Sequence, residues 1–392
     1  MCNVFMSLIN HIYLLAIQFH INPKKMSTKL VPLKKSPSNG TSSENKTTMK
    51  GLVYNGPGKI EYKDIPKPGI EKPTDALVKM IKTTICGTDL GILHGKTPTV
   101  KPGTTLGHEG IGVIEEVGDS VRNFKKGDRV IISCITADGS CEYCKKQMYG
   151  HCKDGGWILG HLINGTQAEY VRIPHADNSL YTAPEDIDDE ALVMLSDILP
   201  TGFEIGVIYG CVKPGDTIAI VGAGPIGMAA LLTAKFYSPA KIYMIDLDEN
   251  RLEQAKKMGA TDTINSGTDD AIKRIMDETE DGVDVAMEAV GIPATFNICQ
   301  KIVRPGGHVA NIGVHGQSVD LQIQDLWIRN ITITTGLVNT NTTPMLLKTI
   351  ASGKIQPEKL ITHHFKLDEI MQAYEVFGNA AKDKALKIIL TN

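Results

Sequence analysis

The sequence lacks a strong net charge, a dense set of cysteines and an internal repeat. Its 392 residues carry a formal charge of -3, which argues against a nucleic acid as the main partner. Eight cysteines are too few for a disulfide scaffold in a chain of this length. Four of them lie between Cys134 and Cys152, which favours metal binding in a reducing compartment. We therefore expect a cytoplasmic globular protein, long enough for two domains and without a membrane segment.

The first 48 residues differ in composition from the rest. Val4–Ile21 is mostly apolar, but polar side chains interrupt it and no basic stretch precedes it, so it is a poor membrane span and a poor signal peptide. Residues 22–48 have the composition of a disordered linker. Three interpretations stay open for this N-terminal extension: a weak targeting signal, a regulatory tail, or a non-native start upstream of Met26 or Met49.

Two patterns of secondary structure follow. Short β-rich runs at 76–87, 109–118, 128–133 and 167–174 indicate a compact, barrel-like β domain. From about residue 200, apolar strands alternate with helical patterns, which indicates an α/β unit with a doubly wound parallel sheet. We expect a first domain over 49–198, to which 335–392 return, and a second over 199–334.

A glycine-rich turn follows the apolar strand TIAIV and opens a helix. It reads Gly222-Ala-Gly224-Pro225-Ile226-Gly227, and this context is the one that a dinucleotide-binding motif requires. The glycines permit a tight turn, a close approach of the pyrophosphate and close packing of helix on strand. The anion would then lie at the helix N-terminus.

Asp246 ends the next strand, 19 residues after Gly227. This is close to the ~20 expected for an acid that binds the ribose hydroxyls. A carboxylate there repels a 2′-phosphate, so the cofactor is predicted to be NAD in preference to NADP. Asp248 strengthens this preference, whereas Arg251 weakens it as a possible phosphate partner. The alternative is that Asp246 caps the following helix.

Three further groups of residues suggest a metal enzyme. Cys86-Gly-Thr88-Asp89 and Gly-His108-Glu109-Gly are two of them, and the cysteines Cys141, Cys144 and Cys152 are the third. Together with the glycine-rich turn, they make the chain from Met49 to Asn392 resemble the zinc-dependent medium-chain alcohol dehydrogenases, and in particular the secondary-alcohol branch. The resemblance implies a β-rich GroES-like catalytic domain beside a Rossmann domain.

In that family the catalytic zinc has three protein ligands and leaves a fourth position for the substrate oxygen. The resemblance assigns these ligands to Cys86, His108 and Asp197. It makes Glu109 an alternate ligand or a neighbour of the ligands, and Asp89 the acceptor of the second ring N–H of His108. Asp197 as a helix cap and Asp89 as a turn residue are the plain alternatives.

The resemblance also implies how the alcohol proton leaves. Thr88 is expected to receive it, and relatives commonly pass it to a histidine five residues after the cysteine. That position is Gly91 here, and His94 lies one helical turn later. Either His94 replaces the missing histidine or it is an ordinary surface residue.

Further assignments are carried by the resemblance alone, and each of their apolar members could equally be core. Four residues would flank the nicotinamide: Thr201, Val290, Ile312 and Val314. Lys387 would meet the pyrophosphate, and Trp157 and Ile158 would line the substrate pocket.

A second zinc is expected in the cysteine lobe. Relatives with a structural zinc have four cysteines there, and the position of the missing one is Asp138. A carboxylate can ligate zinc, so we expect Asp138, Cys141, Cys144 and Cys152 as ligands. Cys134 and His151 are nearby in sequence, and an empty lobe is a further alternative. Losing one thiolate should weaken zinc binding.

The sequence therefore predicts an enzyme that transfers hydride reversibly between NAD(H) and a small, secondary alcohol or ketone. A dehydrogenase of a polyol, butanediol or threonine is the alternative within the superfamily. A non-catalytic dinucleotide-binding protein is the alternative of another class, and a nucleic-acid-binding zinc ribbon lacks its second CxxC pair. Homo-oligomers, tetramers or dimers, are implied by the relatives alone.

Overall fold

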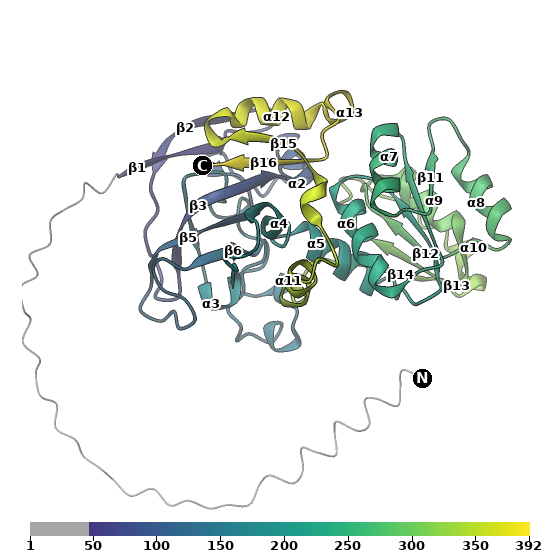
Figure 1. Cartoon of the computed structure of the whole chain (residues 1–392), viewed down its shortest axis with the longest axis horizontal. Helices are drawn as coiled ribbons and strands as arrows, with labels where there is room; N and C mark the ends of the chain where they lie inside the picture. Colours follow the sequence, from purple (N-terminus) through teal and green to yellow (C-terminus); the bar gives the residue numbers. More distant parts are fainter. Residues whose placement is uncertain (1–46) are drawn as a thin grey trace, which may run out of the picture. The chain divides into compact units, whose positions relative to one another are not determined.

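The structure, a computed structural model, describes residues 47–392, which form three sheets (Figure 1). The interpretations of the N-terminal extension concern residues that lie almost entirely outside this range. Between residues 47 and 392, no helix is both long and apolar enough to span a membrane.

The N-terminal half supplies all strands of one sheet and most strands of a second, which the last two strands of the chain complete. A three-stranded sheet has the order β2-β1-β4, and a seven-stranded sheet has the order β15-β16-β3-β5-β6-β8, with β7 paired to β3. The four β runs predicted between residues 76 and 174 are confirmed as β3, β5, β6 and β7. The bounds are β1 Thr48–Tyr54, β2 Ile60–Pro66, β3 Ala76–Ile85, β4 Thr104–Thr105, β5 Gly110–Val117, β6 Arg129–Ile132, β7 Tyr170–Ile173, β8 Leu180–Thr182, β15 Ile361–Lys366 and β16 Lys387–Thr391.

The third sheet is six-stranded and parallel throughout, in the order β11-β10-β9-β12-β13-β14. This confirms the doubly wound sheet that the alternation of strands and helices predicts. The strands are β9 Thr217–Val221, β10 Lys241–Asp246, β11 Asp262–Asn265, β12 Val283–Glu288, β13 Val303–Asn311 and β14 Thr332–Thr335. The helices between them are α6 Pro225–Ala234, α7 Glu249–Met258, α8 Ala271–Thr279, α9 Pro293–Ile302 and α10 Ile323–Leu326.

Strand β9 shows why both faces of this sheet are covered. Its side chains alternate between the faces, as the pleat requires. Ile218 and Ile220 join the apolar cluster that includes residues of α6 and α7, whereas Ala219 and Val221 join the cluster that includes residues of α8 and α9. Figure 1 shows α6 and α7 on one side of these strands and α8 on the other. A strand buried on both faces reads as a continuous apolar run, as TIAIV does.

The chain returns to the seven-stranded sheet at its C-terminus. Strand β16 pairs antiparallel with β3, with Ile388 opposite Ile85. Cys86 follows β3 directly, so the closing strand lies beside the start of the candidate site. The remaining helices are α2 Gly87–Leu93, α3 Ala176–Ser179, α4 Asp189–Val193, α5 Ile198–Thr201, the π-helix η3 Gly202–Ile208, α11 Thr343–Ala351, α12 Ile370–Gly378 and α13 Ala380–Asp383.

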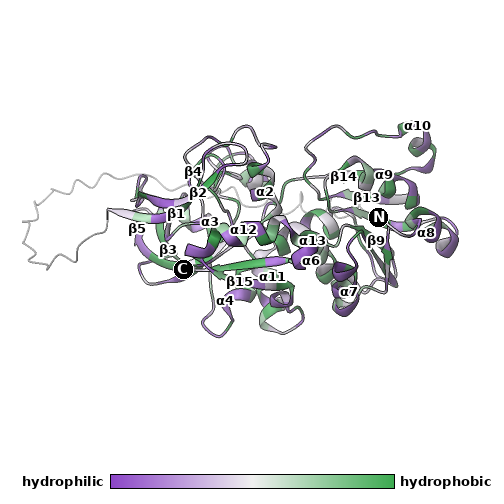
Figure 2. Ribbon diagram, turned by 90° about the horizontal axis from the view of Figure 1, so that it is seen from above, coloured by the Kyte–Doolittle hydropathy of each residue, from purple (hydrophilic) through white to green (hydrophobic). Residues whose placement is uncertain are grey.

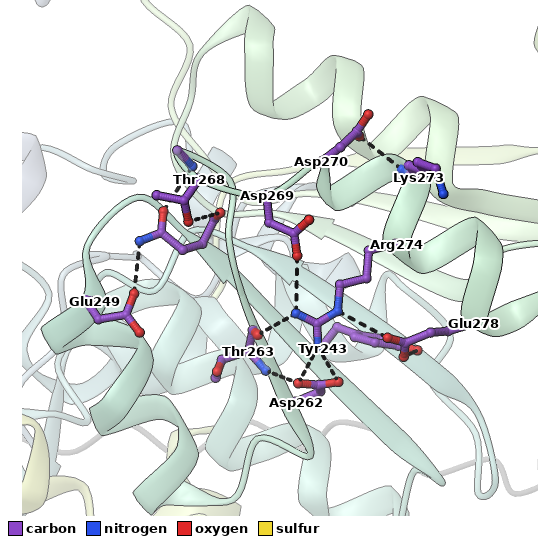
Figure 3. A network of polar contacts seen from close by, with 12 residues as sticks. Tyr243, Glu249, Asp262, Thr263, Thr268, Asp269, Asp270, Lys273, Arg274 and Glu278 are labelled. Atoms are coloured by element: carbon purple, nitrogen blue, oxygen red, sulfur yellow. Dashed lines mark hydrogen bonds and ion pairs between the residues drawn. The ribbon is translucent and has the colours of Figure 1, made fainter.

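Charged side chains join the outer strands of the six-stranded sheet to α8. Arg274 donates to both carboxylate oxygens of Asp262 at 3.0 Å and through Nε to Glu278 at 3.1 Å (Figure 3). Glu278 also accepts from Tyr243 at 2.7 Å. Figure 2 shows the polar character of the outer helices, with α7 and α8 largely hydrophilic on their exposed turns. Arg274 thus links α8 to β11 through its ion pairs, which serve the fold.

Candidate active site

Four side chains of types that can ligate a metal converge from three separate segments. Cys86 precedes the first turn of α2, His108 and Glu109 precede β5, and Asp197 precedes α5. One ligand atom from each lies within 4.8 Å of all the others. His108 Nε2 is 3.4 Å from Asp197 Oδ2, and Cys86 Sγ is 3.9 Å from the same oxygen. The structure thus brings together the three predicted zinc ligands and the neighbouring Glu109.

Asp89 lies behind the imidazole of His108. Its Oδ1 is 3.8 Å from His108 Nδ1, while its Oδ2 accepts from the Cys86 backbone N–H at 2.9 Å and from Gln167 Nε2 at 3.2 Å. Burial raises the pKa of Asp89, against the opposing charge of His108. Asp89 is therefore fixed by α2 and by Gln167, and it is placed to orient the ring of His108. Gln167 helps to hold Asp89, and it could not be identified from the sequence because no motif surrounds it.

The electrostatics of the cluster favour a cation. Burial alone would lower the pKa of His108, but Asp197 and Cys86 outweigh it and hold that pKa well above its usual value. Burial likewise opposes ionisation of Asp197, yet the contact with His108 leaves its pKa lowered. A positive charge is therefore stabilised at the centre of the donors, where a metal ion would take the place of the proton.

Two buried carboxylate oxygens near the donors have no hydrogen-bond partner in residues 47–392, Asp89 Oδ1 and Glu109 Oε1. An unpaired buried carboxylate is costly unless a cation or donor compensates for it. A thiol, an imidazole and a carboxylate are the ligand types that zinc prefers. The residues present therefore fit a zinc ion.

Asp197 has two further neighbours. Thr201 Oγ1 donates to Asp197 Oδ1 at 2.5 Å, and Cys134 Sγ is 3.7 Å from the same oxygen. Burial, followed by the Asp197 charge, raises the pKa of Cys134 well above its usual value. Cys134 thus lies as a neutral thiol beside this cluster and away from the cysteine lobe. The hydroxyl of Thr201, predicted to flank the nicotinamide, is engaged with Asp197.

Glu109 is paired with Lys387, the first residue of β16. The Lys387 ammonium and the Thr84 hydroxyl both contact Glu109 Oε2. Lys387 is fully buried. Burial would lower its pKa, but the Glu109 carboxylate more than offsets this effect. The structure thus places the predicted pyrophosphate partner on Glu109.

Trp157 lies against the donor cluster. Its ring meets that of His108 edge-on, with the centroids 6.5 Å apart, and stacks on His161 at 4.3 Å. His161 Nδ1 lies 2.9 Å from Trp157 O, and its Nε2 lies 2.6 Å from Thr99 Oγ1. The predicted pocket residue Trp157 is therefore next to the donors, and Ile158 follows it in a partly buried position. His161 was missed because it belongs to no motif.

The two residues of the predicted proton relay, Thr88 and His94, lie at opposite ends of α2. Thr88 is half-buried in the first turn of α2, and His94 is exposed at the C-terminal cap of the same helix. Within residues 47–392, no hydrogen bond joins their side chains to each other. Their roles remain predictions.

A second donor set forms in the cysteine lobe. Asp138, Cys141, Cys144 and Cys152 each offer a ligand atom within 4.8 Å of the others. The Sγ atoms of Cys141 and Cys144 are 3.6 Å apart, and the Asp138 N–H points to Cys152 Sγ at 3.2 Å. The set is the one expected from the sequence, with Asp138 as the fourth donor.

The protonation of this lobe also suits a metal. Burial alone would raise the pKa of Asp138, but backbone N–H groups of Ser140 and Cys141 hold it below its usual range. Backbone hydrogen bonds, led by that of Cys144, lower the pKa of Cys141 to about 7. Burial raises the pKa of Cys144 to about 12. The lowered pKa values of Asp138 and Cys141 favour their anionic forms, and metal binding would deprotonate Cys144 and Cys152.

The glycine-rich turn has the geometry of a phosphate site. Gly222 has a φ of +110°, and a Cβ on it would lie 2.5 Å from Val290 Cγ2. A Cβ on Gly227 would lie 1.8 Å from Gly222 O, so only glycine lets the helix pack on the turn. Nothing comes nearer to a Cβ on Gly224 than Arg251, at 4.0 Å. Pro225 and Ile226 then form the first turn of α6.

Asp246 and Asp248 have different local roles. Asp246 Oδ2 accepts from the Ala223 N–H at 2.6 Å, inside the glycine-rich turn, and Oδ1 accepts from Leu247 and Asp248. Asp248, and not Asp246, caps α7, by accepting from the N–H groups of Asn250 and Arg251. Asp246 therefore belongs to the glycine-rich turn. Arg251 Nε is buried without a partner in the described residues, near Gly224.

The other residues predicted to flank the nicotinamide lie at the carboxyl ends of β12 and β13. Val290 and Val314 are 45% and 82% exposed, whereas Ile312 is buried. Glu288 lies beneath them, fully buried, and was missed because a single acid at the end of an apolar strand carries no motif.

The chain matches two family models. Residues 72–185 match the alcohol dehydrogenase GroES-like domain, and residues 225–352 match the zinc-binding dehydrogenase domain. An alcohol dehydrogenase of Cupriavidus necator is 37% identical over 87% of this chain and 98% of its own length. The NADP-dependent isopropanol dehydrogenase of Entamoeba histolytica is 32% identical over 87% and 95%, respectively.

A solved structure is also similar. It is the apo form of zinc-dependent alcohol dehydrogenase 2 from Streptococcus pneumonia, with a TM-score of 0.84 and 60% identity, covering 88% of this chain and 98% of that one.

Proposed function

The chain belongs to the zinc-dependent medium-chain alcohol dehydrogenase family, and from this premise we propose that it oxidises small secondary alcohols with NAD and reduces the corresponding ketones. Membership of this family makes the protein an oxidoreductase that acts on CH–OH donors, with zinc and a nicotinamide dinucleotide as cofactors. Oxidation of a polyol is also compatible with membership of this family.

One observation carries the site assignment, namely the convergence of Cys86, His108, Glu109 and Asp197 within 4.8 Å. Cys86, His108 and Asp197 would hold the catalytic zinc, and Glu109 would be an alternate ligand restrained by Lys387. Asp89 would keep the His108 ring in one orientation, as outer-shell carboxylates do. When bound, zinc supplies Lewis-acid chemistry that lowers the pKa of an alcohol, and the nicotinamide supplies the hydride acceptor.

The protein side chains supply positioning and proton transfer. The Trp157 ring beside His108 gives the substrate an apolar wall, which favours an alkyl group over the hydroxyls of a polyol, butanediol or threonine. Thr88, in the first turn of α2, is proposed to accept the alcohol proton, and His94 to pass it to solvent. The isopropanol dehydrogenase among the relatives supports a secondary alcohol as substrate.

The preference for NAD rests on Asp246. Its carboxylate lies at the glycine-rich turn, where it can accept from ribose hydroxyls and would repel a 2′-phosphate. Arg251 is the opposing feature, and the relative from Entamoeba is named as NADP-dependent. We assign NAD because the carboxylate contacts the turn directly.

The remaining proposals concern organisation. A second zinc is assigned to Asp138, Cys141, Cys144 and Cys152. The catalytic domain would comprise 49–198 with 335–392, and the cofactor domain 199–334. We also propose a cytoplasmic homo-oligomer, a tetramer or a dimer. Its self-association is supported by exposed apolar side chains near strand β14 at the edge of its sheet: Leu321, Ile323, Trp327 and Ile328.

The decisive experiment measures zinc per chain in the full-length protein purified without chelator, together with NAD reduction by 2-propanol. We expect two zinc ions per chain and alcohol-dependent reduction that a chelator abolishes. One zinc with full activity would leave the lobe empty. Activity that survives complete removal of zinc would contradict the proposed catalytic site.

A further inference from the structure

Glu288 ends β12 at the point where the strand order of the parallel sheet changes direction. The chain moves outward from β9 to β11 and then returns to β12 on the other side of β9. The N–H of Ala289 donates to Val221 O at 2.9 Å, so the end of β12 adjoins the start of the glycine-rich turn. Ligands of doubly wound sheets bind outside the carboxyl ends of the strands at such a switch point. Glu288 therefore lies directly beneath the expected cofactor crevice.

One carboxylate oxygen of Glu288 fixes the turn that follows β12. Glu288 Oε1 accepts from the N–H groups of Val290 at 2.9 Å and Gly291 at 2.8 Å. It also accepts from Thr295 Oγ1 at 2.6 Å. The side chain is 0% exposed. Three donors on one buried, charged oxygen make this a strong local restraint.

The other oxygen faces the loop that follows β13. Glu288 Oε2 is 3.3 Å from His315 Nε2 and has no hydrogen-bond partner in the described part of the chain. A Cβ on Gly313 would lie 2.3 Å from this oxygen. The N–H groups of Ile312 and Gly313 donate to Glu288 O at 2.8 and 3.1 Å. The side chain of Glu288 thus holds the loop after β12, and its backbone carbonyl holds the loop after β13.

These two loops carry exposed apolar side chains at the carboxyl ends of β12 and β13. Val290 is 45% exposed and Val314 is 82% exposed. The loops themselves touch closely, because a Cβ on Gly291 would lie 2.3 Å from Val314 O. They belong to β12 and β13, the half of a dinucleotide fold that receives the second mononucleotide. Because the adenosine half of the cofactor is assigned to Asp246, the half of the fold that contains β12 and β13 would receive the nicotinamide.

We propose that Glu288 is a positioning residue for the nicotinamide half of the cofactor, which sets the backbone of Val290–Gly291 against that of Gly313–Val314. His315 Nε2 lies 3.3 Å from the second carboxylate oxygen and is held there by its bond to Asn311 Oδ1 at 2.8 Å. The inference rests on the proposed function, because it uses the same cofactor site. Because Glu288 is fully buried, it would act through the two loops.

The test compares two ligands that share the adenosine half. In the full-length protein, Glu288→Gln keeps the side-chain size but replaces one acceptor oxygen with an amide donor, which opposes the surrounding N–H groups. We expect its Kd for NADH, measured by calorimetry, to rise about tenfold, or about 1.4 kcal/mol. We expect its Kd for ADP-ribose, which lacks the nicotinamide, to stay within about twofold of the wild-type value.

Two further variants make the result specific. Asp75→Asn alters another fully buried carboxylate, which accepts from the Lys72 N–H and from Arg172 in the seven-stranded sheet, and it should lower Tm without changing NADH affinity. His315→Gln should show the same selective loss for NADH as Glu288→Gln, to a smaller degree. If Glu288→Gln does not fold, the His315→Gln result decides.

Equal losses of NADH and ADP-ribose, or wild-type NADH affinity in both variants at the switch point, would overturn the positioning role. A wild-type protein that binds neither ligand would instead contradict the proposed cofactor site. The two failures are therefore distinguishable.

Discussion

His108 Nε2 lies 3.4 Å from Asp197 Oδ2, and both side chains are buried. The two residues come from separate segments, one before β5 and one before α5. Burying an imidazole and a carboxylate together is costly unless each compensates for the other or a cation is shared. Their approach, with Cys86 3.9 Å from the same carboxylate oxygen, is the central feature of the candidate metal site.

Asp197→Asn should remove the catalytic zinc. The amide cannot supply an anionic ligand, so zinc per chain should fall by about one and alcohol-dependent NAD reduction should fall to background. Elemental mass spectrometry and a coupled absorbance assay measure both. Cys134→Ser is the matched control, because Cys134 lies 3.7 Å from Asp197 Oδ1 and is not a proposed ligand. An Asp197→Asn enzyme with wild-type zinc and rate would show that this carboxylate is not a ligand.

Asp138→Ala should release the lobe zinc and lower Tm while sparing the chemistry. A structural zinc contributes directly to folding, so its loss is expected to lower Tm by several degrees, about 4 °C or more for a loss of ~2 kcal/mol. The control is Asp154→Ala, an exposed carboxylate close in sequence that pairs with Lys72. Unchanged zinc content in Asp138→Ala would exclude this carboxylate from the site.

Asp246→Ala should shift the cofactor preference toward NADP. Without the carboxylate, the ribose hydroxyls lose an acceptor and a 2′-phosphate meets less repulsion beside Arg251. We expect the ratio of kcat/KM for NADP to that for NAD to rise about tenfold or more, a change of about 1.4 kcal/mol. Glu253→Ala removes an exposed charge from α7, the helix that carries Arg251, and should leave the ratio unchanged. A constant ratio in Asp246→Ala would place the selectivity elsewhere.

Glu278 should stabilise the fold in a pH-dependent manner. Hydrogen bonds, led by that of Lys241, lower the pKa of Glu278 to about 2 from its usual 4.5. A lowered pKa in the folded state contributes stability that is present above 4.5 and is lost as the pH falls through about 2. Glu278→Gln should therefore lower the free energy of unfolding at pH 7, and the difference from wild type should shrink below pH 4.5. Urea titrations at several pH values measure it, and a difference that is independent of pH would refute this role.

Trp157→Ala should widen the substrate pocket. Removing the ring beside His108 opens space for larger alkyl groups, so kcat/KM for 2-propanol should fall while that for a bulkier secondary alcohol falls less or rises. The second tryptophan, Trp327, is 68% exposed, and Trp327→Ala is the control. Equal losses for both alcohols would remove Trp157 from the pocket wall.

Local sequence determined much of this protein. The spacing of Gly222, Gly224 and Gly227 after an apolar strand is enough to predict a strand, a turn and a helix, because only glycine allows the close contacts seen there. The cysteine lobe is similar, since Asp138 and Cys152 are only 14 residues apart and the short loop brings their donors together. The parallel sheet followed from alternating apolar strands and helical patterns.

Only the tertiary structure decided how distant segments meet. Lys387 is 278 residues from Glu109, and their contact arises because β16 pairs with β3 beside the candidate site. The carboxylate oxygen Oε1 and the backbone carbonyl of Glu288 likewise join two loops whose approach depends on the order of the strands. No local pattern encodes such contacts, because burial and hydrogen bonding of these charged groups exist only once the sheets have formed.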